Sequence, residues 1–323
     1  MSIDVLFKLL GLFTVIVIGW GASRAGVFRS PDASKVLSNA AFLVFGPALL
    51  FRTTARMDFA APPVQMLIAF FAPALLWMAV VRWVARRRRP AHPARPAVLA
   101  VTLGFGNSVQ LGIPMAATVF GDAGLQLHLA IVSLHALLLL SLGTAWAELD
   151  VAHARAQAQG RRPTLGRTLL TTARHALIHP VVLPVLLGLG WNALALPLPV
   201  LLDDGLQLLG QGMVPLCLLL IGVALDEYGL RDGWRGALAT SVLKLFVMPA
   251  FIGAVAVGLF GLSGLPLSVV VLAAALPVGS NPLLFAHRYG TMEARTTATI
   301  VLSTAAYVLA APFWLWVLGQ WAR

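Results

Sequence analysis

The sequence is poor in charged residues, and poorest in acidic ones. Only 11% of its 323 residues are Asp, Glu, Lys or Arg, and just 12 residues are acidic. Soluble domains carry about 25% charged residues, so this composition excludes an ordinary soluble fold. The chain has one cysteine, Cys217, which lies in an apolar run and cannot form an intramolecular disulfide.

The side-chain arrangements that mark an enzyme or a metal centre are missing as well. No nucleophile lies in a recognisable pattern with a base, and no paired carboxylates occur within the apolar runs. The seven histidines show no metal-ligand spacing. We therefore expect a protein that is not an enzyme and that holds no metal and no cofactor.

Long apolar runs dominate what is present, because 59% of the residues are hydrophobic. A membrane-spanning helix needs about 20 apolar residues. Ten runs qualify as candidates, and we number them in chain order: 5–20, 36–51, 64–84, 97–120, 125–146, 176–196, 206–225, 236–260, 265–286 and 297–318. The prediction is an all-α polytopic membrane protein with ten transmembrane helices, whose first partner is the lipid bilayer.

The basic residues predict the orientation of these helices. Of the 23 Lys and Arg residues, 17 lie in the loops after the odd-numbered runs, including the arginine run at 86–89, and Arg82 lies at the end of the third run on the same side. Because positive charge marks the cytoplasmic side, both termini are expected outside, which is the periplasm for a bacterial inner membrane. This pattern explains the net charge of +11 without a nucleic-acid partner.

Two of the ten runs are interrupted in the middle by polar residues and helix breakers. The fourth contains GFGNSVQLGIPM at 104–115, and the ninth contains LPVGSNPLL at 276–284. Glycine loosens a helix, and proline removes a backbone donor and clashes with the preceding turn. Broken backbone at membrane depth is tolerated only where protein buries it or where it lines a cavity. We therefore expect both helices to break.

Two interrupted segments in corresponding places point to the substrate site of a transporter. The break residues are Gly106, Gly112, Pro114, Gly279 and Pro282, and the candidate substrate-binding residues are Asn107, Ser108, Gln110, Ser280 and Asn281. Half-helix N-termini and neutral donors suit a carboxylate. The alternative is that both segments are proline-kinked packing helices, in which the Asn and Ser side chains form hydrogen bonds to neighbouring helices.

Two further residues have open roles. Lys244 lies eight residues into the eighth run, where it could snorkel to the interface, stabilise the broken ninth helix or attract an anion. His135, near the middle of the fifth run, could donate a hydrogen bond between helices or couple transport to protons.

The two halves of the chain look duplicated. Pro47 and Pro215 are 168 residues apart, as are Pro114 and Pro282, and Phe120-Gly121 recurs 169 residues later as Tyr289-Gly290. The predicted division is a first repeat at 1–147, a cytoplasmic loop at 148–175 and a second repeat at 176–323. The polar part of the loop, 148–167, could also form a short surface helix. Since each half has five segments, the second repeat enters the membrane from the opposite side.

Five stretches resemble the auxin efflux carrier family, which includes bacterial malate- and malonate-type permeases. They are FGPALLFR at 45–52, GNSVQLGIP at 106–114, FGDAG at 120–124, LKLFVMP at 243–249 and LPVGSNPLLFAHRYG at 276–290. Their order and spacing match the family over nearly the whole chain.

The resemblance implies a fold similar to that of sodium–bile acid symporters. The fourth and ninth helices would cross near Pro114 and Pro282 at the substrate site. Helices one, two, six and seven would form a scaffold domain, and helices three to five and eight to ten a transport domain. Relatives imply a homodimer through the scaffold.

The expected function is transport of small organic-acid anions by alternating access, driven by coupling to an ion gradient or by membrane potential. Export is the favoured direction. One alternative is a sodium-coupled organic-anion symporter on the same fold, although no Asp or Glu lies deep in a run to help bind sodium. A different class is a membrane-embedded sensor.

Overall fold

The computed structural model describes residues 3–28, 33–56, 63–88, 90–159, 182–228, 234–279 and 281–321. Ser280 of the predicted site and residues 160–175 of the predicted loop lie outside this set. Within it, the secondary structure is helical except for one isolated bridge between two extended residues.

The helices follow the order of the predicted runs. The first half contains α1 (Ile3–Arg24), α2 (Ala33–Ala40), η1 (Ala41–Phe45), α3 (Gly46–Ala55), α4 (Val64–Arg87), α5 (Arg95–Gly104), η2 (Ser108–Gly112), α6 (Ile113–His135), η3 (Ala136–Leu140) and α7 (Ser141–Gln159). The second half contains α9 (Val182–Ala193), α10 (Val200–Tyr228), α11 (Trp234–Val242), η4 (Leu243–Val247), α12 (Met248–Gly258), α13 (Gly264–Ala275), α14 (Asn281–Tyr289) and α15 (Glu293–Trp321). The η elements are π-helical turns.

Several of these helices are long and apolar enough to cross a membrane. In the described part of the chain, five helical runs meet this condition by length and composition, and three shorter apolar helices accompany them. Two of the short helices, α5 and α13, are short because the predicted fourth and ninth segments break where they end. The architecture is that of a polytopic membrane protein.

Two details differ from the sequence-based expectation. Helix α7 continues to Gln159, so residues 148–159 of the predicted loop are helical. Their Ala, Gln and Arg residues are good helix formers, so this stretch is helical, as a continuation of α7 rather than as a separate surface helix. In addition, α6 is bent at Gly121, which separates the predicted fourth and fifth segments without a loop.

Prolines account for three of the four π-helical turns. Pro47, Pro114 and Pro249 each lie two residues beyond the last residue of a π-turn. A proline ring collides with the carbonyl one turn earlier and offers that carbonyl no N–H. Widening the preceding turn moves the carbonyl away, and such π-bulges occur frequently at functional sites.

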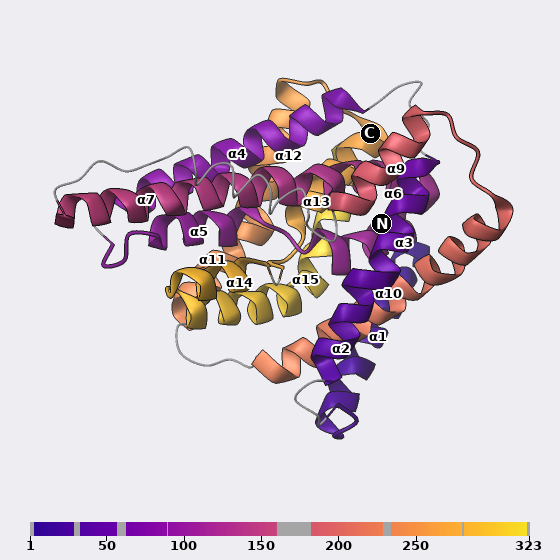
Figure 1. Cartoon of the computed structure of the whole chain (residues 1–323), viewed down its shortest axis with the longest axis horizontal. Helices are drawn as coiled ribbons and strands as arrows, with labels where there is room; N and C mark the ends of the chain where they lie inside the picture. Colours follow the sequence, from indigo (N-terminus) through magenta and orange to yellow (C-terminus); the bar gives the residue numbers. More distant parts are fainter. Residues whose placement is uncertain are drawn as a thin grey trace.

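The helices form two groups that lie side by side (Figure 1). The first group comprises α1, α2, α3, α9 and α10, with α1 packed on α10 and α3 packed on α9. The second group comprises α4 to α7 and α11 to α15, and its largest apolar core joins α4, α5, α12 and α13. Each group therefore mixes helices from the two halves of the sequence.

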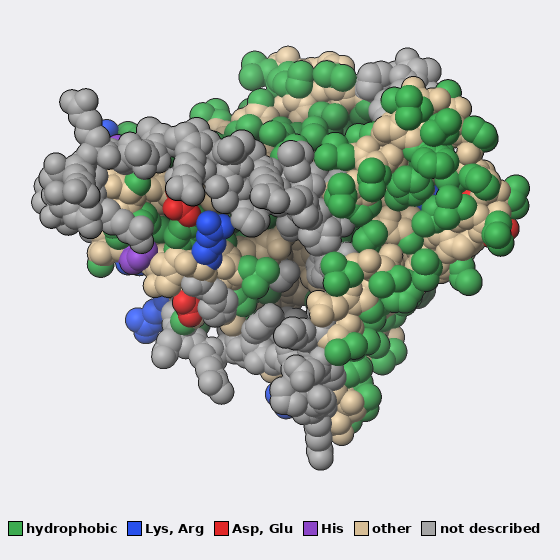
Figure 2. Space-filling model, in the orientation of Figure 1, with side chains coloured by type: hydrophobic (Ala, Val, Ile, Leu, Met, Phe, Trp, Pro, Cys, Tyr) green, Lys and Arg blue, Asp and Glu red, His purple; other side chains and the backbone are tan. Residues whose placement is uncertain are grey.

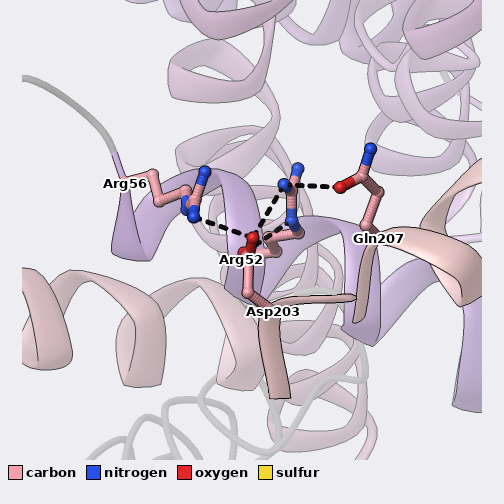
Figure 3. Close-up of polar contacts among 4 residues, drawn as sticks. All are labelled: Arg52, Arg56, Asp203 and Gln207. Carbon is pink, nitrogen blue, oxygen red and sulfur yellow. Dashed lines mark hydrogen bonds and ion pairs between the residues drawn. The ribbon is translucent and has the colours of Figure 1, made fainter. Parts of the chain in front are cut away.

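Ion pairs between described residues stay within a group. In the first group, Asp203 on α10 accepts hydrogen bonds from Arg52 at 2.8 and 3.2 Å and pairs with Arg56 at 2.7 Å. Gln207 completes this cluster through Arg52 (Figure 3). The cluster ties the end of α3 to the start of α10, where a carboxylate also suits the helix N-terminus.

The second group is joined by its own ion pairs. Asp150 on α7 pairs with Arg82 on α4 at 2.8 Å. Glu148, also on α7, accepts hydrogen bonds from Arg288 at 3.1 Å and from the Tyr289 hydroxyl at 2.9 Å, both on α14. Figure 2 shows charged side chains toward this side of the molecule, whereas hydrophobic side chains cover the face over the first group.

Apolar residues fill the boundary between the groups. One cluster joins Ile16 of α1 and Leu218 of α10 to Leu111, Met115 and further residues of the second group. Another joins Leu50 of α3 to α6. The ion pairs that join described residues all lie within one group or the other, so none of them crosses this boundary.

Candidate functional site

The two broken segments cross each other at the centre of the second group. Helix α5 ends at Gly104, and Phe105 is extended; α13 ends at Ala275, after which Leu276 leaves the helix. Gly106 and Val278 form an antiparallel bridge, and the Asn107 N–H donates to the Pro277 carbonyl at 2.7 Å. The freed backbone groups of each break thus find partners in the other, as a buried break requires.

Glycines allow the two backbones to approach this closely. A Cβ at Gly279 would lie 3.3 Å from the Asn107 Cα, and a Cβ at Gly106 would lie 3.2 Å from the Leu276 Cβ. Both distances are tighter than ordinary side-chain contacts. The predicted break residues Gly106 and Gly279 are therefore brought together face to face.

Asn107 starts the second half of the fourth segment. It is buried, and its side-chain oxygen accepts from the Gln110 N–H at 3.2 Å, which caps η2. Its amide also lies 3.4 Å from the Gln110 side-chain oxygen. Ser108 is buried in the first turn of η2. The capping interaction fixes the turn that ends at Pro114.

Asn281 holds the matching place in the ninth segment. It is the first residue of α14, and Pro282 is buried directly after it. Asn281 follows the crossing residue Gly279 by two positions. Of the predicted binding residues, the structure places Asn107, Ser108 and Gln110 together on one side of the crossing and Asn281 at the start of the opposing half-helix.

Sequence inspection did not single out His128, which the structure places against the crossing. The ring is buried on α6, and its Nε2 lies 2.8 Å from the Ser108 carbonyl. The ring also occupies the space beside Gly112, where a Cβ would collide with it. The available signal was its separation of seven residues from His135, which puts both rings on one face of a helix.

A small pocket opens between the two broken segments. Its walls are apolar except for His128, and they come from α6 and α13: Gly112, Met115, Ala116, Phe120, His128, Val269, Leu272, Ala273 and Leu276. The two π-turn residues nearest to it, Leu111 and Gly112, are buried. Among the described residues, the predicted binding residues Asn107, Ser108, Gln110 and Asn281 do not line this pocket.

Lys244 caps the carbonyl end of α13. Its side chain is fully buried, and its Nζ donates to the Ala274 carbonyl at 2.6 Å. The amine therefore does not snorkel to the interface. A cation suits the negative end of a helix. In the first half, the Trp77 ring N–H donates to the Leu103 carbonyl near the end of α5 at 3.3 Å, so both broken segments are capped from a neighbouring helix.

His135 has no hydrogen-bonding partner among the described residues at either ring nitrogen. It is buried, and its ring centroid lies 4.5 Å from that of Phe105 and 6.0 Å from that of Phe70. Lys244 and His128 are close enough to interact with it electrostatically. The Gly106 backbone also lies close enough to the ring to interact with it. Both predicted roles of His135, a hydrogen bond between helices and proton coupling, therefore stay predictions.

Helix α15 supplies the last side of the site. The Ser303 hydroxyl accepts from the Val278 N–H at 3.1 Å, directly at the crossing. The Trp314 ring N–H donates to the Leu245 carbonyl at 2.7 Å and so fixes α15 against η4. Together these groups offer neutral hydrogen bonds and one cation, a set that suits a singly charged anion.

Metal-ligand clusters are not found in the portion of the chain that the structure describes. The ion-paired carboxylates there, such as Asp150 and Asp203, are held by arginines away from the crossing.

Comparison with known proteins agrees with this architecture. A family model described as a membrane transport protein matches residues 4–315. An "uncharacterized transporter" of Methanothermobacter thermautotrophicus is 24% identical over 310 residues, covering 96% of this chain and 97% of that protein. The "uncharacterized transporter YfdV" of Escherichia coli K12 is 22% identical over 317 residues, covering 96% of both chains.

A plant protein matches part of the chain. The "probable auxin efflux carrier component 3b" of Oryza sativa subsp. japonica is 27% identical over 156 residues. The match covers 46% of this chain and 26% of the rice protein.

Proposed function

The chain belongs to the membrane transport protein family that includes the auxin efflux carriers, and from this premise we propose that it moves small organic-acid anions across the inner membrane. The observation that carries the proposal is the crossing of the two broken segments around Gly106 and Val278. Transporters place their substrate where half-helices meet near the bilayer midplane.

The chemistry at the crossing favours an anion. Asn107 and Ser108 begin one half-helix and Asn281 begins the other, and a helix N-terminus offers free backbone N–H groups that suit an anion. Lys244 contributes a cation behind the end of α13. Among the described residues, no carboxylate lies in the pocket that would repel an anion. The rice relative's description as an auxin efflux carrier is consistent with export of an organic acid.

Alternating access would use the two helix groups. The first group corresponds to the scaffold helices expected from the family resemblance, and the second group to the transport helices. Ion pairs hold each group together, and the boundary between them is apolar. A movement of the second group, with the crossing inside it, would carry the substrate from one membrane face to the other.

Flux into proteoliposomes tests the proposal. Radiolabelled carboxylates are offered while membrane potential, pH gradient and sodium gradient are set independently. We expect flux that follows membrane potential or a proton gradient and that persists when potassium replaces sodium. Flux that requires sodium would favour the symporter alternative, and a folded protein that moves no carboxylate would contradict the substrate class.

Substitution at the crossing tests the site. Asn107→Ala removes the cap of η2 and a donor at the crossing, and Asn281→Ala removes the matching group of α14. We expect flux to fall at least about tenfold in each variant, because a hydrogen bond to a charged ligand contributes roughly 1.5–3 kcal/mol. Asn39→Ala, at an exposed position of α2, is the matched control and should transport normally. Normal flux in both site variants would exclude this assignment.

A further inference from the structure

Tyr307 on α15 carries a buried hydroxyl that has no hydrogen-bonding partner among the described residues. Its side chain is completely inaccessible, and it is among the largest fully buried side chains in the described chain. Buried hydroxyls nearly always find a partner, because leaving one unpaired costs the free energy of removing it from water. A phenylalanine would fill the same space without this cost, so the hydroxyl calls for an explanation.

The hydroxyl lies in the boundary between the two helix groups. Tyr307 belongs to the apolar cluster that joins Ile16 of α1 and Leu218 of α10 to the crossing segments. Three members of this cluster also line the pocket: Met115, Leu272 and Leu276. Tyr307 does not itself line the pocket, but it belongs to the same apolar cluster as three residues that do.

The neighbouring turn of α15 connects Tyr307 to the crossing. Ser303, four residues earlier and on the same face of the helix, accepts the hydrogen bond from the Val278 N–H. Long side chains in helices point back toward the N-terminus, which here is the direction of Ser303. Tyr307 thus lies one helical turn after the residue that contacts the crossing.

We propose that the Tyr307 hydroxyl is a substrate-binding group that donates a hydrogen bond to the carboxylate carried at the crossing. The inference rests on the proposed function and adds a residue to its site. In the structure described here, the apolar cluster closes over the hydroxyl. When the groups separate and a carboxylate enters, its oxygen becomes the missing acceptor, and a hydrogen bond to a charged group is among the stronger ones.

The test is Tyr307→Phe in the purified full-length protein, which removes only the hydroxyl. Binding is measured by thermal shift against pairs of small carboxylates and their neutral amides, and the melting temperature without ligand is recorded in the same experiment. We expect the carboxylate dissociation constant to rise about tenfold or more, while the ligand-free melting temperature stays equal or increases.

The matched control is Tyr289→Phe, the same substitution at a hydroxyl that has a partner. Tyr289 donates to Glu148 at 2.9 Å, away from the crossing. This variant should lose melting temperature and keep carboxylate affinity. The same loss of a hydroxyl is therefore expected to lower carboxylate affinity at Tyr307 and to lower the melting temperature at Tyr289.

Two results would overturn the inference. Unchanged carboxylate affinity in Tyr307→Phe would show that the hydroxyl does not bind substrate, and a lower melting temperature would show that a water or another group already satisfies it. Failure of the proposed function is visible in the wild-type protein alone. If the wild-type protein binds amides better than carboxylates, the proposed substrate class is wrong, and a loss of amide affinity in Tyr307→Phe would still support a binding role for the hydroxyl. If the wild-type protein binds neither ligand, both the proposed function and the inference fail.

Discussion

Lys244 is a single residue in which stability and function oppose each other. Its fully buried amine makes one described hydrogen bond, to the Ala274 carbonyl, and no described carboxylate pairs with it. Burying a cation without a partner charge costs several kcal/mol, more than the roughly 1.5–3 kcal/mol that one such hydrogen bond returns. The proposed anion at the crossing would supply the partner charge that Lys244 lacks among the described residues.

Lys244→Met is therefore expected to leave the melting temperature equal or higher and to abolish the preference for carboxylate over amide in proteoliposome flux. Arg235→Met is the matched control, because Arg235 is an exposed cation on the same membrane segment. A clear loss of stability, with the flux preference retained, would reduce Lys244 to a helix cap.

The residues that the sequence revealed and those it concealed differ in how their roles arise. Asn107, Pro114 and Lys244 stand out because a polar or helix-breaking residue interrupts an apolar run. His128 and Tyr307 become candidates only from the three-dimensional structure. His128 contacts the Ser108 carbonyl, and the Tyr307 hydroxyl is buried without a partner among the described residues. Such contacts depend on how distant segments pack, which periodicity and spacing do not specify.

At the scale of elements, one glycine separates two membrane segments without a loop. Gly121 has φ 67° and ψ −161°, a conformation that only glycine adopts readily, and it bends α6 sharply. Gly290, its counterpart 169 residues later, also has a positive φ of 59° and separates α14 from α15. The recurrence of Phe-Gly and Tyr-Gly in the sequence thus corresponds to two bends with left-handed glycines.

Gly121→Ala should destabilise the protein by about 1–3 kcal/mol through backbone strain alone, because an added Cβ meets nothing within 4 Å. Thermal unfolding measures the loss. The control is Gly319→Ala in α15, where a Cβ also meets nothing within 4 Å but the backbone is helical, and where alanine should stabilise slightly. Equal melting temperatures for the two variants would contradict the strain.

The element boundaries show where prediction from sequence succeeds. The breaks after Gly104 and Ala275 were predictable, since glycine and proline interrupt apolar runs there. The π-turns were not, because they depend on how each helix accommodates its proline. The polar stretch from residue 148 was compatible with a loop or a short surface helix, and helix propensity explains why α7 continues through it to Gln159.

At the scale of the whole molecule, the distribution of arginines predicts which ends face the cytoplasm. His153 is exposed near the end of α7, on the side expected inside, and Leu194 is exposed after α9, on the side expected outside. The orientation follows from the positive-inside rule applied to the loops. It remains a prediction that labelling of intact cells can test.

With the buried Cys217 replaced by serine, a cysteine at Leu194 should react with a membrane-impermeant maleimide in intact cells. A cysteine at His153 should react only with a permeant reagent or after lysis. Each variant serves as the control for the other, and the reverse labelling pattern would place both termini in the cytoplasm.

The packing of α1 on α10 has a consequence for how the protein is made. Gly19 and Gly222 let the two helices approach so closely that a Cβ at either would collide with the backbone of the other helix. The Ser23–Asp226 hydrogen bond at the end of this contact joins residues 203 positions apart. The ribosome therefore releases α1 long before its partner exists, and lipid or an insertion factor must cover its glycine face in the meantime. Because α1 and α10 lie in different halves of the chain, neither half completes this packing alone.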